Sequence, residues 1–285
     1  MLRFDRQLRS DSFQRRTSRA VSFALALIVL LAPLAALDTT PAAASGDVHF
    51  VALVDDGAAV FTNPAGLLWL DKRNLRLEVT SLSAPGSTTR SFVYSEPDMG
   101  VGAGALSYLS SPAVTRYMYT VARKAGPASA IGANLKYETT SAGSWWGLDL
   151  GYRYVVTQGV QLGFAVENAI SSRGRAGRFG PSLPRRSPSL RVGASLSQGG
   201  GLFLAGDYYD PDLDSHAAKP VYRIIAGLVL GSMTIWGGQE TSEEFSKPAN
   251  LLGIKLKLDL LHLDMGLRRS SDGEQTLTVG LAYHF

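Results

Sequence analysis

The histidines and carboxylates of the chain are the residues whose types could support catalysis. A nucleophilic triad needs a serine, a histidine and an orienting carboxylate within hydrogen-bond reach. His262 and Asp264 are two residues apart, which on a strand puts both side chains on one face, about 7 Å apart. No serine accompanies them, since Ser270 and Ser271 lie at the far end of the segment. We therefore expect no enzyme activity here.

Metal and cofactor chemistry finds little support. Asp207, Asp210, Asp212 and Asp214 cluster around a loop, and carboxylates suit Ca²⁺, but the glycine and closing glutamate of an EF-hand are missing. The chain has no cysteine, which excludes thiolate metal sites, disulfides and a lipoprotein anchor. The glycine-rich stretches lack the lysine and serine or threonine of a phosphate-binding loop. We expect neither a metal nor a cofactor.

A basic connection, residues 171–187, is the next chemical feature. Its arginines are Arg173, Arg175, Arg178, Arg185 and Arg186. Guanidinium groups pair well with phosphate, but no aromatic platform for nucleic-acid bases accompanies them. We expect no nucleic-acid partner, and on a cell surface the phosphates of lipopolysaccharide become the candidate ligand.

Residues 1–44 have the pattern of a Sec-type signal peptide. Six arginines precede an apolar run at 21–36, and three alanines at 42–44 form a small-residue cleavage site. The apolar run is short for a membrane span of about 20 residues. The segment carries six Arg and three Asp, so it supplies +3 of the total charge of +4. The basic excess therefore belongs mostly to export, and the mature chain is predicted to begin near Ser45.

Alternation of apolar and polar residues dominates the rest of the chain. In the segment 145–154, the residues Trp146, Leu150 and Tyr152 share one face, while Asp149 and Arg153 share the other. A soluble sandwich or a membrane barrel could both use such strands. The segments run for about 9 to 13 residues, close to the 9–11 of a tilted membrane-spanning strand, which favours the barrel.

Fourteen strands are predicted from this pattern, an even number as bacterial barrels require. Their ranges are 74–82, 88–95, 100–110, 114–124, 128–139, 144–156, 160–170, 188–198, 201–210, 219–230, 232–241, 248–258, 260–270 and 275–285. The long connections at 171–187, 211–218 and 242–247 all fall on one side, and short turns fall on the other. Outer loops are long and periplasmic turns short in outer-membrane barrels. We predict an all-β, transmembrane, antiparallel up-and-down β-barrel over residues 74–285, located in the bacterial outer membrane.

The polar faces of these strands predict the lumen lining. The charged and histidine residues assigned to it are Arg76, Glu78, Lys136, Glu138, Asp149, Arg153, Glu167, Arg191, Lys255, Lys257, Asp259, His262, Asp264 and Arg268. A lining of one sign would indicate an ion-selective pore, whereas this mixture indicates cross-lumen pairs or a wet interior. Aromatic residues near strand ends predict interfacial girdles: Trp69, Trp145, Trp146, Tyr208, Tyr209, Trp236, Tyr283 and Phe285.

The last strand ends in an aromatic pattern. Leu281, Tyr283 and Phe285 alternate to the final residue. An amphipathic last strand that ends in Phe resembles the signal read by the barrel-assembly machinery, and we assign that role to Tyr283 and Phe285. The alternative is an ordinary edge strand.

The segment 45–73, ahead of the barrel, does not alternate. Asn63 before Pro64 starts a turn, and Gly66 can take a positive φ. A barrel of fourteen strands leaves a lumen that something must fill or leave open. We predict that residues 45–73 form a plug inside the barrel, anchored by Asn63, Pro64 and Ala65.

The same segment carries a family resemblance. Its motif residues Asp56, Phe61, Asn63, Pro64, Ala65 and Gly66 stand in a stretch that resembles the N-terminal motif of FadL-type outer-membrane transporters, and of their PorV/PorQ-like branch in particular. The resemblance implies a fourteen-stranded barrel with an N-terminal hatch. For the transporters it implies passive movement of hydrophobic molecules with lateral release into the membrane. For the PorV-like branch it implies handling of secreted proteins. A purely structural barrel is the third possibility.

Overall fold

The computed structural model describes residues 50–53, 56–82, 88–176, 181–197, 201–214, 218–242 and 248–285. The predicted signal peptide and the first five residues of the predicted plug lie outside these ranges, as does Arg178. Within the described ranges, none of the helices has the length and apolar character needed to cross a membrane.

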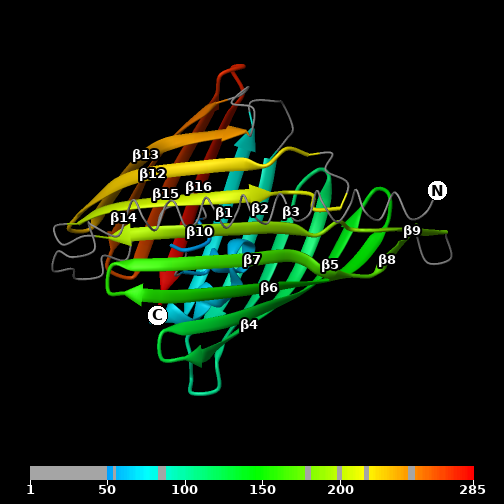
Figure 1. Cartoon of the computed structure of the whole chain (residues 1–285), viewed down its shortest axis with the longest axis horizontal. Coiled ribbons are helices and arrows are strands. Elements are labelled where there is room, and N and C mark those ends of the chain that lie inside the picture. Colours follow the sequence, from blue (N-terminus) through cyan, green and yellow to red (C-terminus); the bar gives the residue numbers. More distant parts are fainter. Residues whose placement is uncertain are drawn as a thin grey trace.

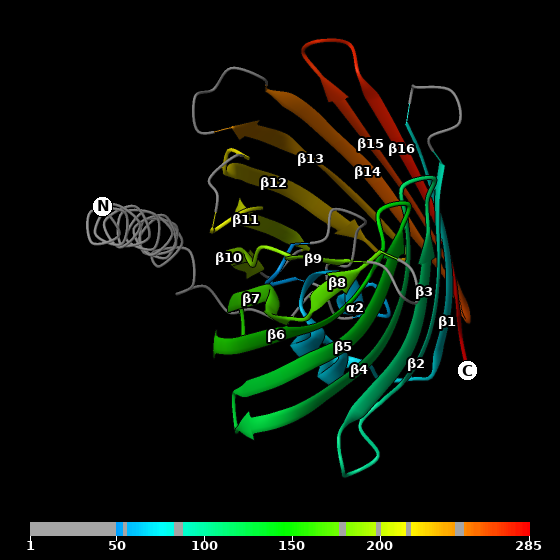
Figure 2. The same cartoon turned by 90° about the vertical axis from the view of Figure 1, so that its right-hand side faces the viewer.

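In the described part of the chain, fourteen strands form one closed antiparallel barrel, as the alternation predicted. They are β1 (Asn74–Leu82), β2 (Thr88–Glu96), β3 (Ala103–Ser110), β4 (Val114–Gly126), β5 (Ser129–Thr140), β6 (Ser144–Thr157), β7 (Val160–Ser171), β10 (Ser189–Ser197), β11 (Leu202–Asp210), β12 (Val221–Leu230), β13 (Met233–Ser242), β14 (Ala249–Leu258), β15 (Leu261–Ser270) and β16 (Gln275–His284). Each strand pairs with its neighbours in the chain, and β1 closes the barrel by pairing with β16 from Asn74–His284 to Leu82–Thr276. Figures 1 and 2 show the strands tilted around a central space.

Exposure alternates along most strands and matches the predicted faces, whereas β10 and most of β11 are buried on both faces. Trp146 is 54% exposed on the outer surface, whereas its neighbour Trp145 is 6% exposed on the inner one. Leu150 and Tyr152 are exposed outward, and Asp149 is buried inward. Apolar side chains face outward on strand after strand, and such a continuous apolar outer band is the surface of a membrane barrel.

Two predicted details were wrong. Trp145 and Trp236 point into the barrel and are buried, Tyr209 faces inward against Arg191, and Trp69 belongs to the segment before β1, so these four do not form girdles. Whether a side chain faces lipid or lumen is decided by its odd or even position along the strand, and nearness to a strand end does not decide it.

The start of one strand also differs from the prediction. β3 begins at Ala103 and not at residue 100, because Gly100 and Gly102 have positive φ and donate their amides to the Asp98 carboxylate.

The basic connection also differs from a simple loop. It contains two short strands, β8 (Arg173–Arg175) and β9 (Ser182–Arg185), which pair with each other. β8 also pairs with the start of β6 through Ser144 and Arg175. Gly174 lies on the ring of Trp145, and the Trp145 indole donates to the Pro184 carbonyl at 2.9 Å. Burial of this tryptophan is what folds the connection against the wall.

Ahead of β1, the chain forms two short helices, α2 (Ala59–Thr62) and the 3₁₀-helix η2 (Pro64–Trp69). Asn63 separates them in an extended conformation, and its side chain accepts from the Ala65 amide as an N-cap. Pro64 follows at the first helical position, where its missing N–H costs nothing. In Figure 2 these helices, in blue, lie within the ring of strands.

Candidate functional site

We call residues 50–53 and 56–70 the lumen segment, and the inner wall around it is the candidate site. Asn63 is its central contact, with no exposed surface. Its amide nitrogen donates to the Val51 carbonyl at 2.8 Å and to the Tyr152 carbonyl of β6 at 3.1 Å. Asn134 of β5 donates to the Val60 carbonyl at 2.8 Å. One buried amide thus ties both halves of the segment to the wall.

Glycines on the inner wall make this approach possible. Gly132 and Gly151 face each other across β5 and β6, and a Cβ at either position would collide with Asn63, Pro64 or Ala65. A Cβ at Gly163 of β7 would collide with the backbone of Val51. The backbone of the segment therefore lies directly on the backbone of the wall.

Asp56 connects the segment to the opposite side of the barrel. Its carboxylate lies 3.2 Å from the Lys255 ammonium of β14 and 3.8 Å from the Arg76 guanidinium of β1. Arg76 also binds Asp264 at 2.5 Å and Glu78 at 2.9 Å. Burial raises the pKa of Asp56, but Lys255 and Arg76 outweigh it and hold that pKa well below its usual range. Asp56 is therefore ionised and held between two cations.

Asp207 of β11 provides a third attachment. Its carboxylate oxygens accept from the Val51 amide at 3.1 and 3.2 Å. Asp207 is buried and faces inward, on the strand that the sequence predicts over residues 201–210.

Apolar layers fill the space between these polar contacts. Ala59, Val60 and Leu67 pack with a cluster from β2, β3 and β4 that includes Val93 and Met118. On the other side, the apolar partners of the segment form a second cluster: Phe50 and Leu53 with Phe203, Ala205, Ile225, Trp236 and Leu251. The lumen segment therefore packs on the wall around the barrel.

Most of the predicted lumen residues occupy the inner face and contact a partner. Lys136 binds Asp149 at 2.6 Å, Glu167 lies 3.5 Å from Arg191, and Arg268 binds Glu240 at 2.8 Å. The Glu138 carboxylate forms ion pairs with Arg116 at 2.8 Å and with Arg186 at 2.6 Å.

The remaining lumen residues make other contacts. Arg153 stacks on the Trp69 ring at 4.3 Å. Lys257 is partly buried. The rings of His262 and His284 lie 4.0 Å apart.

Other predicted residues lie away from this centre. Arg173, Arg175 and Arg185 are exposed on β8 and β9, whereas Arg186 turns onto the ring of Trp145 at 4.1 Å. Phe61 is partly buried against the first apolar cluster, and Gly66 is buried in η2. Tyr283 and Phe285 are exposed, with their rings stacked 5.6 Å apart.

The acidic connection after β11 folds on itself. The Asp212 amide donates to Asp210, and the Asp214 amide donates to Asp212. In the ranges that the structure describes, no group of three or more histidine or carboxylate side chains is placed to hold a metal ion.

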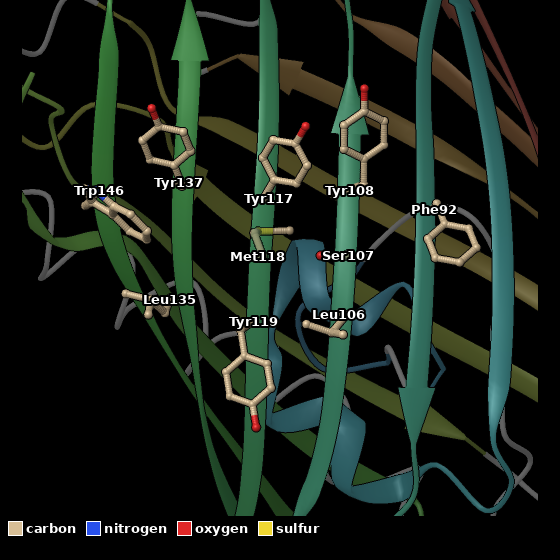
Figure 3. A pocket seen from close by; sticks show the side chains of 10 residues that line it. All are labelled: Phe92, Leu106, Ser107, Tyr108, Tyr117, Met118, Tyr119, Leu135, Tyr137 and Trp146. Atoms are coloured by element: carbon tan, nitrogen blue, oxygen red, sulfur yellow. The ribbon is translucent and has the colours of Figure 1, made fainter. Parts of the chain in front are cut away.

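Two grooves cross the outer face of β2–β6. The first, of about 400 Å³, is lined by aromatic and apolar side chains (Figure 3). In that view the hydroxyls of Tyr108, Tyr117 and Tyr137 point toward the same end of the barrel, the end at which β3 finishes. The second, of about 770 Å³, has Gly132 and Gly151 in its lining. At these two glycines a single backbone layer separates the groove from the lumen segment.

Two contact residues were not predicted as site residues. Asn134 and Glu240 make their contacts with residues distant in sequence. The sequence alternation could predict that their side chains face inward, but it could not predict which residues they contact. The recurrence of glycine at inward positions was the available signal for a close approach to the wall.

Solved structures share this architecture. The toluene transporter TbuX of Ralstonia pickettii is 14% identical with a TM-score of 0.60, over 81% of this chain and 94% of that one. The toluene transporter TodX of Pseudomonas putida is 12% identical with a TM-score of 0.60, over 86% and 99%. A TodX deltaS2S3 mutant, described as a monoaromatic hydrocarbon channel, is 12% identical with a TM-score of 0.58, over 81% of this chain and 95% of that one. No family model matches the chain, and no curated protein matches its sequence. At these identities the likeness establishes the barrel fold of outer-membrane transporters.

Proposed function

We propose that the protein is a passive outer-membrane channel for small hydrophobic molecules and that the lumen segment is its plug. The attachment of that segment across the lumen, by Asn63 on one side and Asp56 on the other, is the observation that carries the proposal. TbuX and TodX, which share the fold, are toluene transporters by name.

The nature of the attachments supports a plug that can be displaced. The contacts are hydrogen bonds and ion pairs at a few points, with small apolar clusters between them. A hydrophobic solute can compete with the apolar clusters, since their driving force is non-directional. The apolar groove outside Gly132 and Gly151 offers a place of release toward lipid.

Locking the plug tests this function. The chain has no cysteine, so two introduced cysteines can form only one disulfide within the chain. A Cβ at Gly57 would lie 3.5 Å from the Ser95 hydroxyl of β2 and 2.8 Å from the Asn74 side-chain oxygen, so cysteines at positions 57 and 95 come within reach of each other once the Asn74 amide turns aside. In liposomes, the oxidised Gly57→Cys/Ser95→Cys variant should lose uptake of a labelled hydrophobic probe, and reduction should restore it.

A matched pair controls for the disulfide itself. The hydroxyls of Thr80 and Thr278 lie 3.1 Å apart across β1 and β16, so Thr80→Cys/Thr278→Cys links two wall strands and leaves the plug free. Uptake by this control should be the same when oxidised and reduced. Equal uptake by the oxidised and reduced plug variant would refute gating by the segment, and no uptake by the wild type would refute the channel.

The motif also supports the alternative of a PorV-like partner in protein secretion. Co-purification of a secretion component with the barrel, lost on Asn63→Ala, is the test of that role. The exposed arginines Arg173, Arg175 and Arg185 are proposed to meet lipopolysaccharide phosphate. Weaker retention of labelled lipopolysaccharide by their triple glutamine variant is the expected result.

A further inference from the structure

A cavity of about 270 Å³ lies on the inner face of β13–β16, away from the contacts of Asn63 and Asp56. Its size is close to the lower end of small-molecule sites, about 300–1,000 Å³. Among the described residues, its polar lining includes Arg191, Arg223, Arg268 and Glu240, and its apolar lining includes Trp236 and Leu251.

The register of the wall creates this space. Trp236, Gly253, Gly266 and Thr278 stand opposite one another in a row across β13, β14, β15 and β16. The indole of Trp236 lies over Gly253, where a Cβ would collide with it. Because Gly266 also has no side chain, the row is open beside the indole.

Hydrogen-bond donors outnumber acceptors around the cavity. Each guanidinium has five N–H donors. Arg223 donates to one oxygen of Glu240 at 2.6 Å and Arg268 to the other at 2.9 Å. Arg191 lies 3.5 Å from Glu167 and stacks on Tyr209. Asp207 accepts from the Val51 amide, and the mostly exposed Glu274 lies 3.9 Å from Arg268.

Two of the buried donors lack a partner. Within the described part of the chain, the Trp236 indole nitrogen and the Arg191 Nε have no hydrogen-bond acceptor. Trp236 is only 3% exposed. Buried polar groups are nearly always paired in proteins, so these donors point to an acceptor that comes from outside the chain.

We infer that this cavity binds a small aromatic carboxylate. A carboxylate is a pure acceptor that can take two parallel bonds from an arginine, and it satisfies the indole N–H as well. The aromatic ring packs on Leu251 and Trp236, which belong to the same cluster as Phe50 of the lumen segment. The inference rests on the proposed function, because it places an anionic aromatic ligand against the apolar cluster that holds Phe50 of the plug.

Binding to the purified full-length barrel in micelles tests the inference. The probes are 4-fluorobenzoate and the neutral 4-fluorotoluene, followed by ¹⁹F NMR, with acetate as a competitor. 4-Fluorobenzoate should bind saturably and much more tightly than 4-fluorotoluene or acetate. Arg268→Gln should weaken its binding by about tenfold or more, as expected for a lost charge-assisted contact. Arg116→Gln, the same change at the lumen residue that pairs with Glu138, should leave binding unchanged.

A second variant guards against misfolding. Trp236→Phe keeps an aromatic floor and removes only the unpaired donor, so it should weaken 4-fluorobenzoate and leave 4-fluorotoluene unaffected. Equal binding of the two probes by the wild type, equal competition by acetate, or equal effects of Arg268→Gln and Arg116→Gln would overturn the inference. If the protein takes up hydrocarbons but does not bind 4-fluorobenzoate, the carboxylate site is refuted and the proposed channel stands. If it binds 4-fluorobenzoate but takes up no hydrocarbon, the proposed channel is refuted and the site stands.

Discussion

Neutralising Asp56 should release the plug while leaving the barrel folded. Asp56→Asn keeps the shape of the side chain and the acceptor for the Ala58 amide, which lies at 2.8 Å. It removes the negative charge between Lys255 and Arg76, at 3.2 and 3.8 Å. Both cations then depend on their remaining carboxylates on the wall.

The expected magnitude follows from what those cations retain. Breaking a buried ion pair costs about 3–5 kcal/mol. Arg76 keeps Asp264 at 2.5 Å, and Lys255 keeps it at 3.7 Å, so the lower end, about 3 kcal/mol, applies. Since each 1.4 kcal/mol is about a factor of ten, the equilibrium between bound and released plug should shift by about 100-fold.

Single-channel recording in planar bilayers measures that shift as the fraction of time spent in a high-conductance state. Asp98→Asn is the matched control, because the Asp98 carboxylate caps the turn between β2 and β3 through Gly100 and Gly102. The control should behave as the wild type. If Asp56→Asn left the open fraction unchanged while unboiled samples still ran as folded barrel, the ion pairs would not hold the segment, and the reasoning would be refuted.

Three further outcomes are expected. The lowered pKa of Asp56 means that its contribution is complete above its ordinary pKa of 3.8 and is lost as pH falls through the folded value. The Asp56 component of the wild type's open fraction should therefore rise below about pH 4, and Asp56→Asn should lack that component. Gly151→Ala should loosen the plug by about 1–3 kcal/mol through overpacking, measured by protease sensitivity, whereas Gly104→Ala, with only an ordinary contact at 3.9 Å, should not. Phe285→Ser should lower the amount of heat-modifiable barrel in the outer membrane more than Leu277→Ser on the same strand, and equal losses would remove the assembly role.

The strands were predictable because a membrane barrel imposes one rule over its whole wall. Each strand must place apolar side chains outward at every second position, so errors in single residues do not shift the register. Trp145 and Trp236 illustrate where a second signal misled: their place near strand ends indicated girdles, but their parity sends them inward.

The site was less predictable because its contacts join residues distant in sequence. Asp56 and Lys255 are 199 positions apart, and no periodicity relates them. Asp207 falls on a predicted strand, but nothing in the sequence indicates that its carboxylate accepts from the Val51 amide. The motif around Asn63 indicated an anchor without indicating that Gly132 and Gly151 receive it.

The pairing of β1 with β16 also has a consequence for the order of folding. Asn74 and His284 are neighbours in the closed wall, so the barrel cannot close until its last strand has been made, and that closure is a slow, non-local event. Until then, β1 and β16 are open edges that can pair with other chains. The segment that precedes β1 packs on β6, β11 and β14 as well, and its full binding surface exists only in the closed ring. Closure of the wall therefore completes the binding surface of the segment, and the contacts of the docked segment in turn stabilise the closed ring.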